Sequence, residues 1–240
     1  MECWASALGN CSGSASREHY ISDGIFDGES VSAQGLHWCK TAPVEIGLSS
    51  AVAKILCKRH NEALSPFDGE ASRLSKYLLG SVLDKPLERS ELRVDGRLLE
   101  KWALKTYANL GYIGALDPVH HTRVTPPPFL VTHIFEDTPL PQGIGLYFVS
   151  GKVSNADFRA GVSWTSIRNV AAGGEIVGMT FMLNSVRFVV SAQPGDAAPR
   201  LRRVGTVNDF NYAEANITYR PADITFTSPT AGQKQVLLNW

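Results

Sequence analysis

Two segments of the chain place their apolar residues at helical spacing. The first begins at Ser65, a favourable N-cap followed by a proline suited to the first helical turn, and it ends at Leu79 before a glycine. The second covers residues 97–112. Its apolar positions are Leu98, Leu99, Trp102, Tyr107 and Leu110. Both segments are predicted to be helices with one buried face.

Shorter apolar runs predict the elements before residue 65. Residues 19–22 are compatible with one strand, and the runs 36–40 and 44–48 predict a β-hairpin. Residues 51–56 follow two serines, which favour the start of a helix, so a short helix is predicted there. This helix would lead directly into Cys57.

Beyond the prolines that end at residue 128, the chain consists of short β-rich runs separated by Gly, Asn, Asp and Pro. These runs are residues 129–135, 145–149, 160–165, 176–183, 186–190, 224–226 and 235–238. Asn184 and Ser185 predict a tight turn between two of the runs. Such spacing is typical of an antiparallel sheet in a sandwich or a barrel. The expected organisation is an N-terminal module over residues 1–80, a helical connection over 81–128 and an antiparallel β domain over 129–240.

Composition and charge narrow the function classes. The 23 basic residues equal the 23 acidic ones, so attraction to nucleic acid would have to come from a local patch. No apolar run approaches the roughly 18 residues that a membrane span needs. A signal peptide has a basic region followed by an apolar stretch, and the first residues show no such pattern. A cytoplasmic protein is therefore expected.

The chain has 4 cysteines, and all of them precede residue 58. This number is too small for a disulfide scaffold in a chain of this length and favours thiols or metal ligands. Cys57 and His60 have the Cys-x2-His spacing of half a tetrahedral zinc site, and Cys3 with Cys11 would supply the other half. Cys39 is expected to pack as a small apolar side chain.

The two ligand pairs enclose Glu18 and His19, and Asn61 follows the second pair directly. This order resembles the zinc-bearing HNH, or ββα-metal, nuclease family over about residues 1–79. The resemblance implies an α+β protein that begins with a treble-clef-like module containing a structural zinc ion. Residues 24–56 would then be an insertion in that module.

The resemblance also implies a role for each matching residue. His19 would be the general base, because a neutral imidazole with a pKa of about 6.5 can take a proton from water near neutral pH. Asn61 would orient the site. Glu18 would bind a catalytic Mg2+ or Mn2+, since hard cations prefer carboxylate oxygen. Asp68 or Glu70 would complete that cation site, although their positions also suit a capping box and a helix N-terminus.

Basic residues at Arg17, Lys58 and Arg59 surround this motif and would suit phosphate, although such charges often only solvate a surface. The expected function is a metal-dependent endonuclease that hydrolyses phosphodiester bonds of DNA. The alternative is a non-catalytic, zinc-stabilised module that binds nucleic acid or protein.

Overall fold

The fold is mixed α+β, as expected, and most of its sheets are antiparallel. The computed structural model describes residues 3–36, 38–40, 42–82, 91–150, 161–169, 173–195, 206–207, 210–211, 215–228 and 232–240. The chain divides into two compact units, Met1–Ser72 with Lys101–Leu140, and Arg73–Glu100 with Pro141–Trp240. The domain boundaries predicted at residues 80 and 128 stay a prediction. Helices α2 (Ser65–Val82) and α3 (Gly96–Tyr112) each contribute residues to both units.

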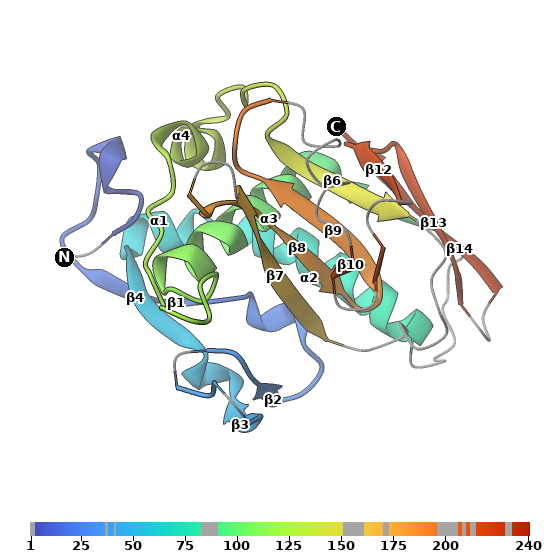
Figure 1. Ribbon diagram of the computed structural model, residues 1–240, viewed down its shortest axis with the longest axis horizontal. Helices are drawn as coiled ribbons and strands as arrows, with labels where there is room; N and C mark the ends of the chain where they lie inside the picture. The colour runs from blue at the N-terminus through green and yellow to red at the C-terminus, as the bar shows by residue number, and fades with distance from the viewer. Residues whose placement is uncertain are drawn as a thin grey trace. The chain divides into compact units, whose positions relative to one another are not determined.

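The first unit contains short strands and short helices in addition to parts of α2 and α3. They are η1 (Ser6–Leu8), β1 (Ala15–His19), η2 (Asp23–Ile25), β2 (Ser30–Ala33), β3 (Val44–Gly47), η3 (Leu48–Ser50), β4 (Val52–Cys57), α1 (Lys58–Glu62) and α4 (Pro128–Glu136). Strands β1 and β4 form an antiparallel pair, which Figure 1 shows leading into α1. A β-bulge interrupts this pair between Ser16 and Glu18.

The predicted helix over residues 51–56 is wrong, because Val52–Cys57 is the strand β4. A segment this short has little helical stability of its own, whereas pairing with β1 satisfies its backbone groups. The predicted hairpin is also wrong in its first strand, since β3 pairs with β2. Gly35, at φ +85°, starts a tight loop in which its N–H donates to the carbonyl of Cys39. Leu36 and Cys39, which were predicted to lie in the strand, are therefore part of this loop, and residue 37 lies outside the described residues.

The predicted strand over residues 129–135 is the helix α4. Pro128 occupies its first turn, where a missing N–H is harmless, and Asp137 ends it with φ +57°. Leu130, Val131 and Ile134 are buried. Their spacing is that of a helix face, so the β-branched residues follow the packing and not their intrinsic preference.

The second unit is built mainly from strands. They are β5 (Glu91–Asp95), β6 (Gly145–Ser150), β7 (Val162–Asn169), β8 (Glu175–Leu183), β9 (Val186–Ser191), β10 (Thr206–Val207), β11 (Phe210–Asn211), β12 (Asn216–Tyr219), β13 (Asp223–Ser228) and β14 (Gly232–Asn239). A 5-stranded antiparallel sheet has the order β12-β6-β9-β8-β7, and a 3-stranded sheet has the order β13-β14-β5. Strand β5 pairs parallel to β14, which the sequence did not indicate. Both sheets have free ends, so the described strands do not close into a barrel.

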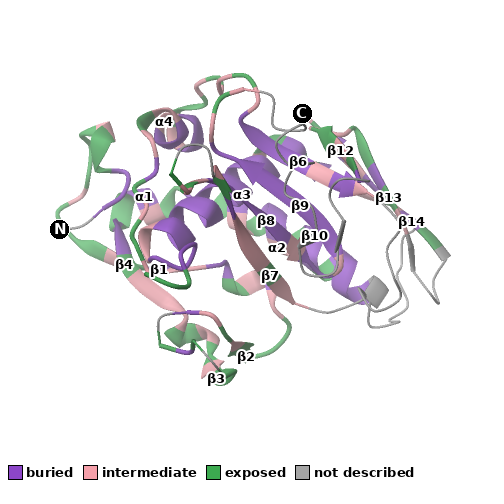
Figure 2. Cartoon of the chain, viewed as in Figure 1, coloured by how far each residue is buried: buried purple, intermediate pink, exposed green. Residues whose placement is uncertain are grey.

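The remaining strand predictions and the predicted turn in this unit are confirmed. Six of the seven predicted β runs correspond to β6, β7, β8, β9, β13 and β14. Asn184 and Ser185 form the turn between β8 and β9, with φ values of +44° and +74°. Strand β9 is buried along its whole length, as Figure 2 shows, and it contributes Val189 to a core cluster with Tyr147 and Val177.

Both predicted helices are present as α2 and α3. Asp95 caps α3, because its Oδ1 accepts hydrogen bonds from the N–H groups of Arg97 and Leu98 at 2.9 and 3.1 Å. Residues 99–111 of α3 are all buried. Among the described residues, no helix combines the length and the apolar character needed to cross a membrane.

Candidate metal centre

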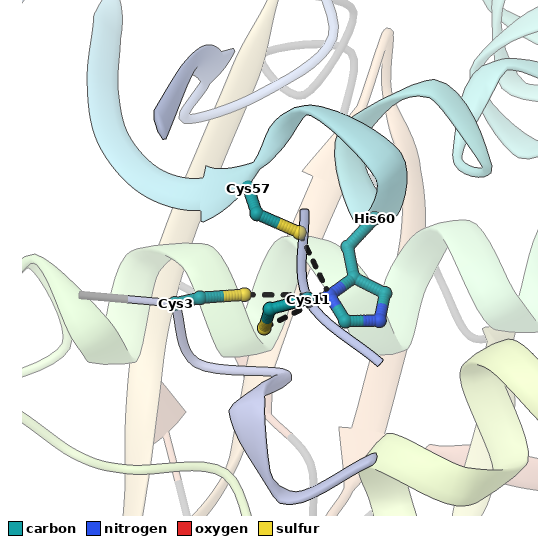
Figure 3. Close-up of side chains that lie close together, drawn as sticks. All are labelled: Cys3, Cys11, Cys57 and His60. Carbon is teal, nitrogen blue, oxygen red and sulfur yellow. Dashed lines mark hydrogen bonds between the residues drawn. The ribbon is translucent and has the colours of Figure 1, made fainter. Parts of the chain in front are cut away.

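Four side chains converge in the first unit to form a metal-type cluster. One ligand atom from each of Cys3, Cys11, Cys57 and His60 lies within 4.8 Å of the other three. Figure 3 shows the three sulfur atoms turned toward the same imidazole nitrogen. These are the four zinc ligands that the sequence predicts. Three thiols and one imidazole form a donor set typical of structural zinc, so the cluster could hold such an ion.

The antiparallel β1–β4 pair, called the β1–β4 hairpin below, brings the two halves of this cluster together. Cys57 ends β4, and His60 lies three residues later on α1. Ala15 is paired with Cys57, so β1 carries the preceding loop, with Cys11, to the same end of the hairpin. Cys3 is held nearby because the N–H of Trp4 donates to the carbonyl of Ile55 at 3.1 Å. The irregular spacing of the first pair is therefore compatible with one site.

His60 faces the cluster with one nitrogen and a polar partner with the other. Its Nδ1 lies 3.2, 3.4 and 3.8 Å from the sulfur atoms of Cys57, Cys3 and Cys11. Its Nε2 lies 2.7 Å from Oδ1 of Asn10. Since an amide oxygen only accepts, Nε2 carries the proton and Nδ1 presents a lone pair to the sulfurs. His60 is thus oriented as a metal ligand.

An apolar shell covers this side of the cluster. The ring of Phe135, on α4, lies 4.9 Å from the His60 ring and 5.6 Å from the ring of Trp4. Cys3, Cys57 and His60 are all buried, whereas Cys11 is exposed. Limited solvent access of this kind stabilises a bound ion against exchange.

Electrostatics within the cluster disfavour three thiolates without a cation. Although Cys11 is exposed, partial desolvation of its thiol, together with the hydrogen bonds and charges of Cys3 and Cys57, raises its pKa from 9.0 to about 12. Burial also opposes ionisation of Cys57, but hydrogen bonds from the His60 backbone and from Ser12 outweigh it and lower its pKa from 9.0 to about 7. Burial and the charge of Arg59 lower the pKa of His60, which keeps the imidazole neutral and able to bind metal. A divalent ion would compensate the charge of the thiolates.

The two residues predicted to be catalytic lie on neighbouring elements, His19 on β1 and Asn61 on α1. His19 is the last residue of β1, and its side chain is 28% exposed with Nε2 3.9 Å from Oδ2 of Asp23. Nδ2 of Asn61 donates to Oγ of Ser16 at 2.8 Å and to the carbonyl of Arg17 at 3.2 Å. Asn61 therefore fixes the β1 backbone two residues before His19.

Glu18 and Asp68 meet at a residue that the sequence did not single out. The buried Lys105 places Nζ 2.7 Å from Oε1 of Glu18 and 2.9 Å from Oδ1 of Asp68. Asn109 donates from Nδ2 to the same Glu18 oxygen at 3.0 Å. Glu70 is also buried on α2. In the part of the chain that the structure describes, only the Cys3–Cys11–Cys57–His60 group brings three or more His, Cys, Asp or Glu side chains into metal-binding proximity.

The predicted phosphate-contacting residues are on the surface. Arg17, Lys58 and Arg59 are exposed. The Arg17 guanidinium donates to the carbonyl of Ser49 at 3.0 Å, and Lys58 lies 3.7 Å from Glu62. Cys39 is buried outside the cluster, as the sequence predicts.

No protein-family model, curated protein or solved structure matches this chain. The functional assignment therefore depends on the motif and the geometry of the first unit.

Proposed function

We propose that this protein is a zinc-stabilised, metal-dependent endonuclease of the HNH type that hydrolyses phosphodiester bonds of DNA. The observation that carries the proposal is the order of the parts around the four-ligand cluster. A loop with Cys3 and Cys11 precedes the β1–β4 hairpin, and Cys57 and His60 follow at its junction with α1. This order resembles that of a treble-clef-like module, in which the cluster would hold a structural zinc ion.

Two positions in the module support a catalytic role. His19 lies partly exposed at the end of β1, where water and a phosphodiester can reach it. A neutral histidine there would remove a proton from the attacking water. Asn61 stabilises the strand that carries His19 through its contact with the Arg17 carbonyl. The exposed Arg17, Lys58 and Arg59 would attract the phosphates of the substrate.

The reaction also requires positive charge beside the phosphate, which we assign to Mg2+ or Mn2+. Such ions are commonly held by one or two carboxylates together with phosphates of the substrate. The HNH resemblance assigns Glu18 to this ion, together with Asp68 or Glu70. Glu18 and Asp68 both contact the ammonium of Lys105, which would compete with a metal ion for their oxygen atoms.

A plasmid-nicking assay with zinc-loaded protein in Mg2+ or Mn2+ tests the proposal. His19→Ala should reduce the rate about 10²–10⁴-fold, as is typical when a general base is removed, while the zinc content stays unchanged. His120→Ala is a matched control, because His120 is an exposed histidine on the same unit. Wild-type protein that cleaves neither DNA nor RNA with any divalent ion would contradict the proposal.

One observation favours a second candidate, a non-catalytic zinc-stabilised binding module. The charge of Glu18 is already compensated by Lys105, so this carboxylate needs no metal ion. The module would then bind nucleic acid through Arg17, Lys58 and Arg59 without cleaving it. Each single replacement by glutamine should reduce the slope of the logarithm of the DNA-binding constant against the logarithm of the salt concentration by about one.

A further inference from the structure

Helix α3 directs a row of polar groups toward the segment that contains His19. Trp102, Lys105 and Asn109 are spaced three and four residues apart, so they lie on one face of the helix. All three are buried. Each donates a hydrogen bond to residues 18–22. The segment around His19 is therefore held by a helix that lies outside the part of the sequence resembling a nuclease.

The contacts at the two ends of this row fix the backbone around His19. Nδ2 of Asn109 donates to the carbonyl of His19 at 3.1 Å, and its Oδ1 accepts from Nε1 of Trp4 at 3.0 Å. Nε1 of Trp102 donates to Oγ of Ser22 at 2.8 Å. The Ser22 hydroxyl in turn donates to Asp68. Asn109 thus links the His19 backbone to Trp4, the neighbour of the metal-type ligand Cys3.

Lys105 is the middle residue of this row, and its side chain is the charged one. Its side chain is fully buried, and the ammonium contacts one oxygen of Glu18 and one oxygen of Asp68. Burial opposes the charged form of Lys105, but the two carboxylates outweigh it and raise its pKa above 10.5. The ammonium therefore stays charged between two acids that come from β1 and α2.

We propose that Lys105 is an internal cation that takes the place of a divalent metal ion between Glu18 and Asp68. An ammonium supplies up to three donors and one positive charge without any need for a bound ion. In this arrangement Glu18 and Asp68 position the strand that carries His19 and do not ligate the catalytic metal. Lys105 acts through those two acids as a positioning residue.

This inference is independent of whether the protein cleaves DNA, because it concerns which cation the two acids hold. An ordinary buried ion pair and an internal substitute for a metal ion differ in one respect. If the ammonium occupies a metal position, removing it while keeping both acids should open a site for Mn2+. The buried Glu18 carboxylate beside the partly buried Asp68 carboxylate would otherwise be disfavoured without a cation.

The test measures Mn2+ binding to the zinc-loaded full-length chain by electron paramagnetic resonance of the free ion. The wild type and Glu18→Gln should bind Mn2+ alike, because Glu18 is already paired. Lys105→Ser should gain one Mn2+ site, tighter by at least on the order of tenfold than any wild-type binding there. The double variant Lys105→Ser with Glu18→Gln should lack this site. Lys105→Arg, which keeps the charge, should lack it too.

Three results would overturn the inference. The first is Mn2+ binding by the wild type that weakens in Glu18→Gln, since Glu18 would then be a metal ligand despite Lys105. The second is a folded Lys105→Ser protein without a new Mn2+ site. The third is a Lys105→Ser protein that folds neither with nor without Mn2+, because a position that fits the ion should take it up during folding. If Lys105→Ser folds only when Mn2+ is present, the inference is supported.

Discussion

Asn10 accepts a 2.7 Å hydrogen bond from His60 and thereby determines which imidazole nitrogen faces the three cysteines. A histidine that binds metal through one nitrogen generally donates from the other to a fixed acceptor, which sets both its tautomer and its ring orientation. Asn10 lies in the same loop as Cys11, so the loop contributes a ligand and also orients the ligand on α1. Asn10 was not singled out from the sequence, because an asparagine beside a cysteine has many local uses.

Replacing Asn10 tests this relationship. Asn10→Ala should weaken zinc binding about 10–100-fold, the usual effect of removing a group that orients a metal ligand. Asn10→Asp keeps an acceptor at the same position and should retain the affinity. Competition with a chromophoric chelator measures both constants. Equal affinity of Asn10→Ala and wild type would show that the His60 ring is held by other contacts.

The four-ligand cluster should contain one tightly bound zinc ion, and the fold should depend on it. Cys57→Ala should lose the metal and lower the Tm by on the order of 10 °C, because structural zinc supplies folding free energy directly. Cys39→Ala is the matched control, since Cys39 is also buried but lies outside the cluster. Elemental analysis and thermal unfolding, with and without a chelator, give the comparison. A zinc-free wild type would refute the assignment, as would a Cys57→Ala protein with an unchanged Tm.

The four members of the metal-type cluster could be predicted from the sequence because their residue types are rare and one pair is close in sequence. Cys57 and His60 are separated by a single helical turn, so local spacing alone places them together. Helices α2 and α3 were also predictable, since each is long enough for the apolar period to be distinct. Strand β4 was not, because its structure is decided by pairing with β1, many residues earlier.

The role of Lys105 could not be predicted from the local sequence either, because its partners also lie far away in the chain. A lysine in a helical pattern normally indicates a solvent-facing position. Here the compensating charge on Glu18 lies 87 residues away in the chain, so only the folded structure reveals that the position is buried. The misassigned α4 is a different case. Pro128 at the helix start was a usable signal, but the β-branched residues that follow favoured a strand.

In the second unit, Arg220 should be important for stability. Its guanidinium contacts both oxygens of the buried Glu100, at 2.5 and 3.1 Å, and lies 5.1 and 5.6 Å from the rings of Tyr219 and Trp240. Arg220→Ala removes both of these contacts from the Glu100 carboxylate, which also accepts a hydrogen bond from the N–H of Leu146. We expect a loss of about 2 kcal/mol, below the roughly 3–5 kcal/mol for a fully buried pair because 32% of the Arg220 side chain is exposed.

Chemical denaturation of Arg220→Ala, Arg220→Lys and Arg220→Ala with Glu100→Gln measures this effect. Lysine cannot reproduce the two-pronged contact, so Arg220→Lys should recover only part of the loss. The double variant removes the buried charge and should be more stable than Arg220→Ala alone. If the single and double variants unfold alike, the Glu100 charge that Arg220 no longer compensates is not the cause of the loss.

Asn61 should affect cleavage through its donor group and not through zinc. Its Nδ2 donates to Ser16 and to the carbonyl of Arg17, so Asn61→Asp removes the donor while preserving the shape of the side chain. We expect the nicking rate of Asn61→Asp to fall by on the order of 10–100-fold, because a small displacement of a catalytic group can cost that much. The zinc content should not change, since the Asn61 side chain contacts β1 and is not one of the four ligands. Asn61→Gln, which keeps an amide on a longer side chain, should recover part of the rate. A proportional loss of zinc and activity in Asn61→Asp would instead assign Asn61 to the stability of the metal centre.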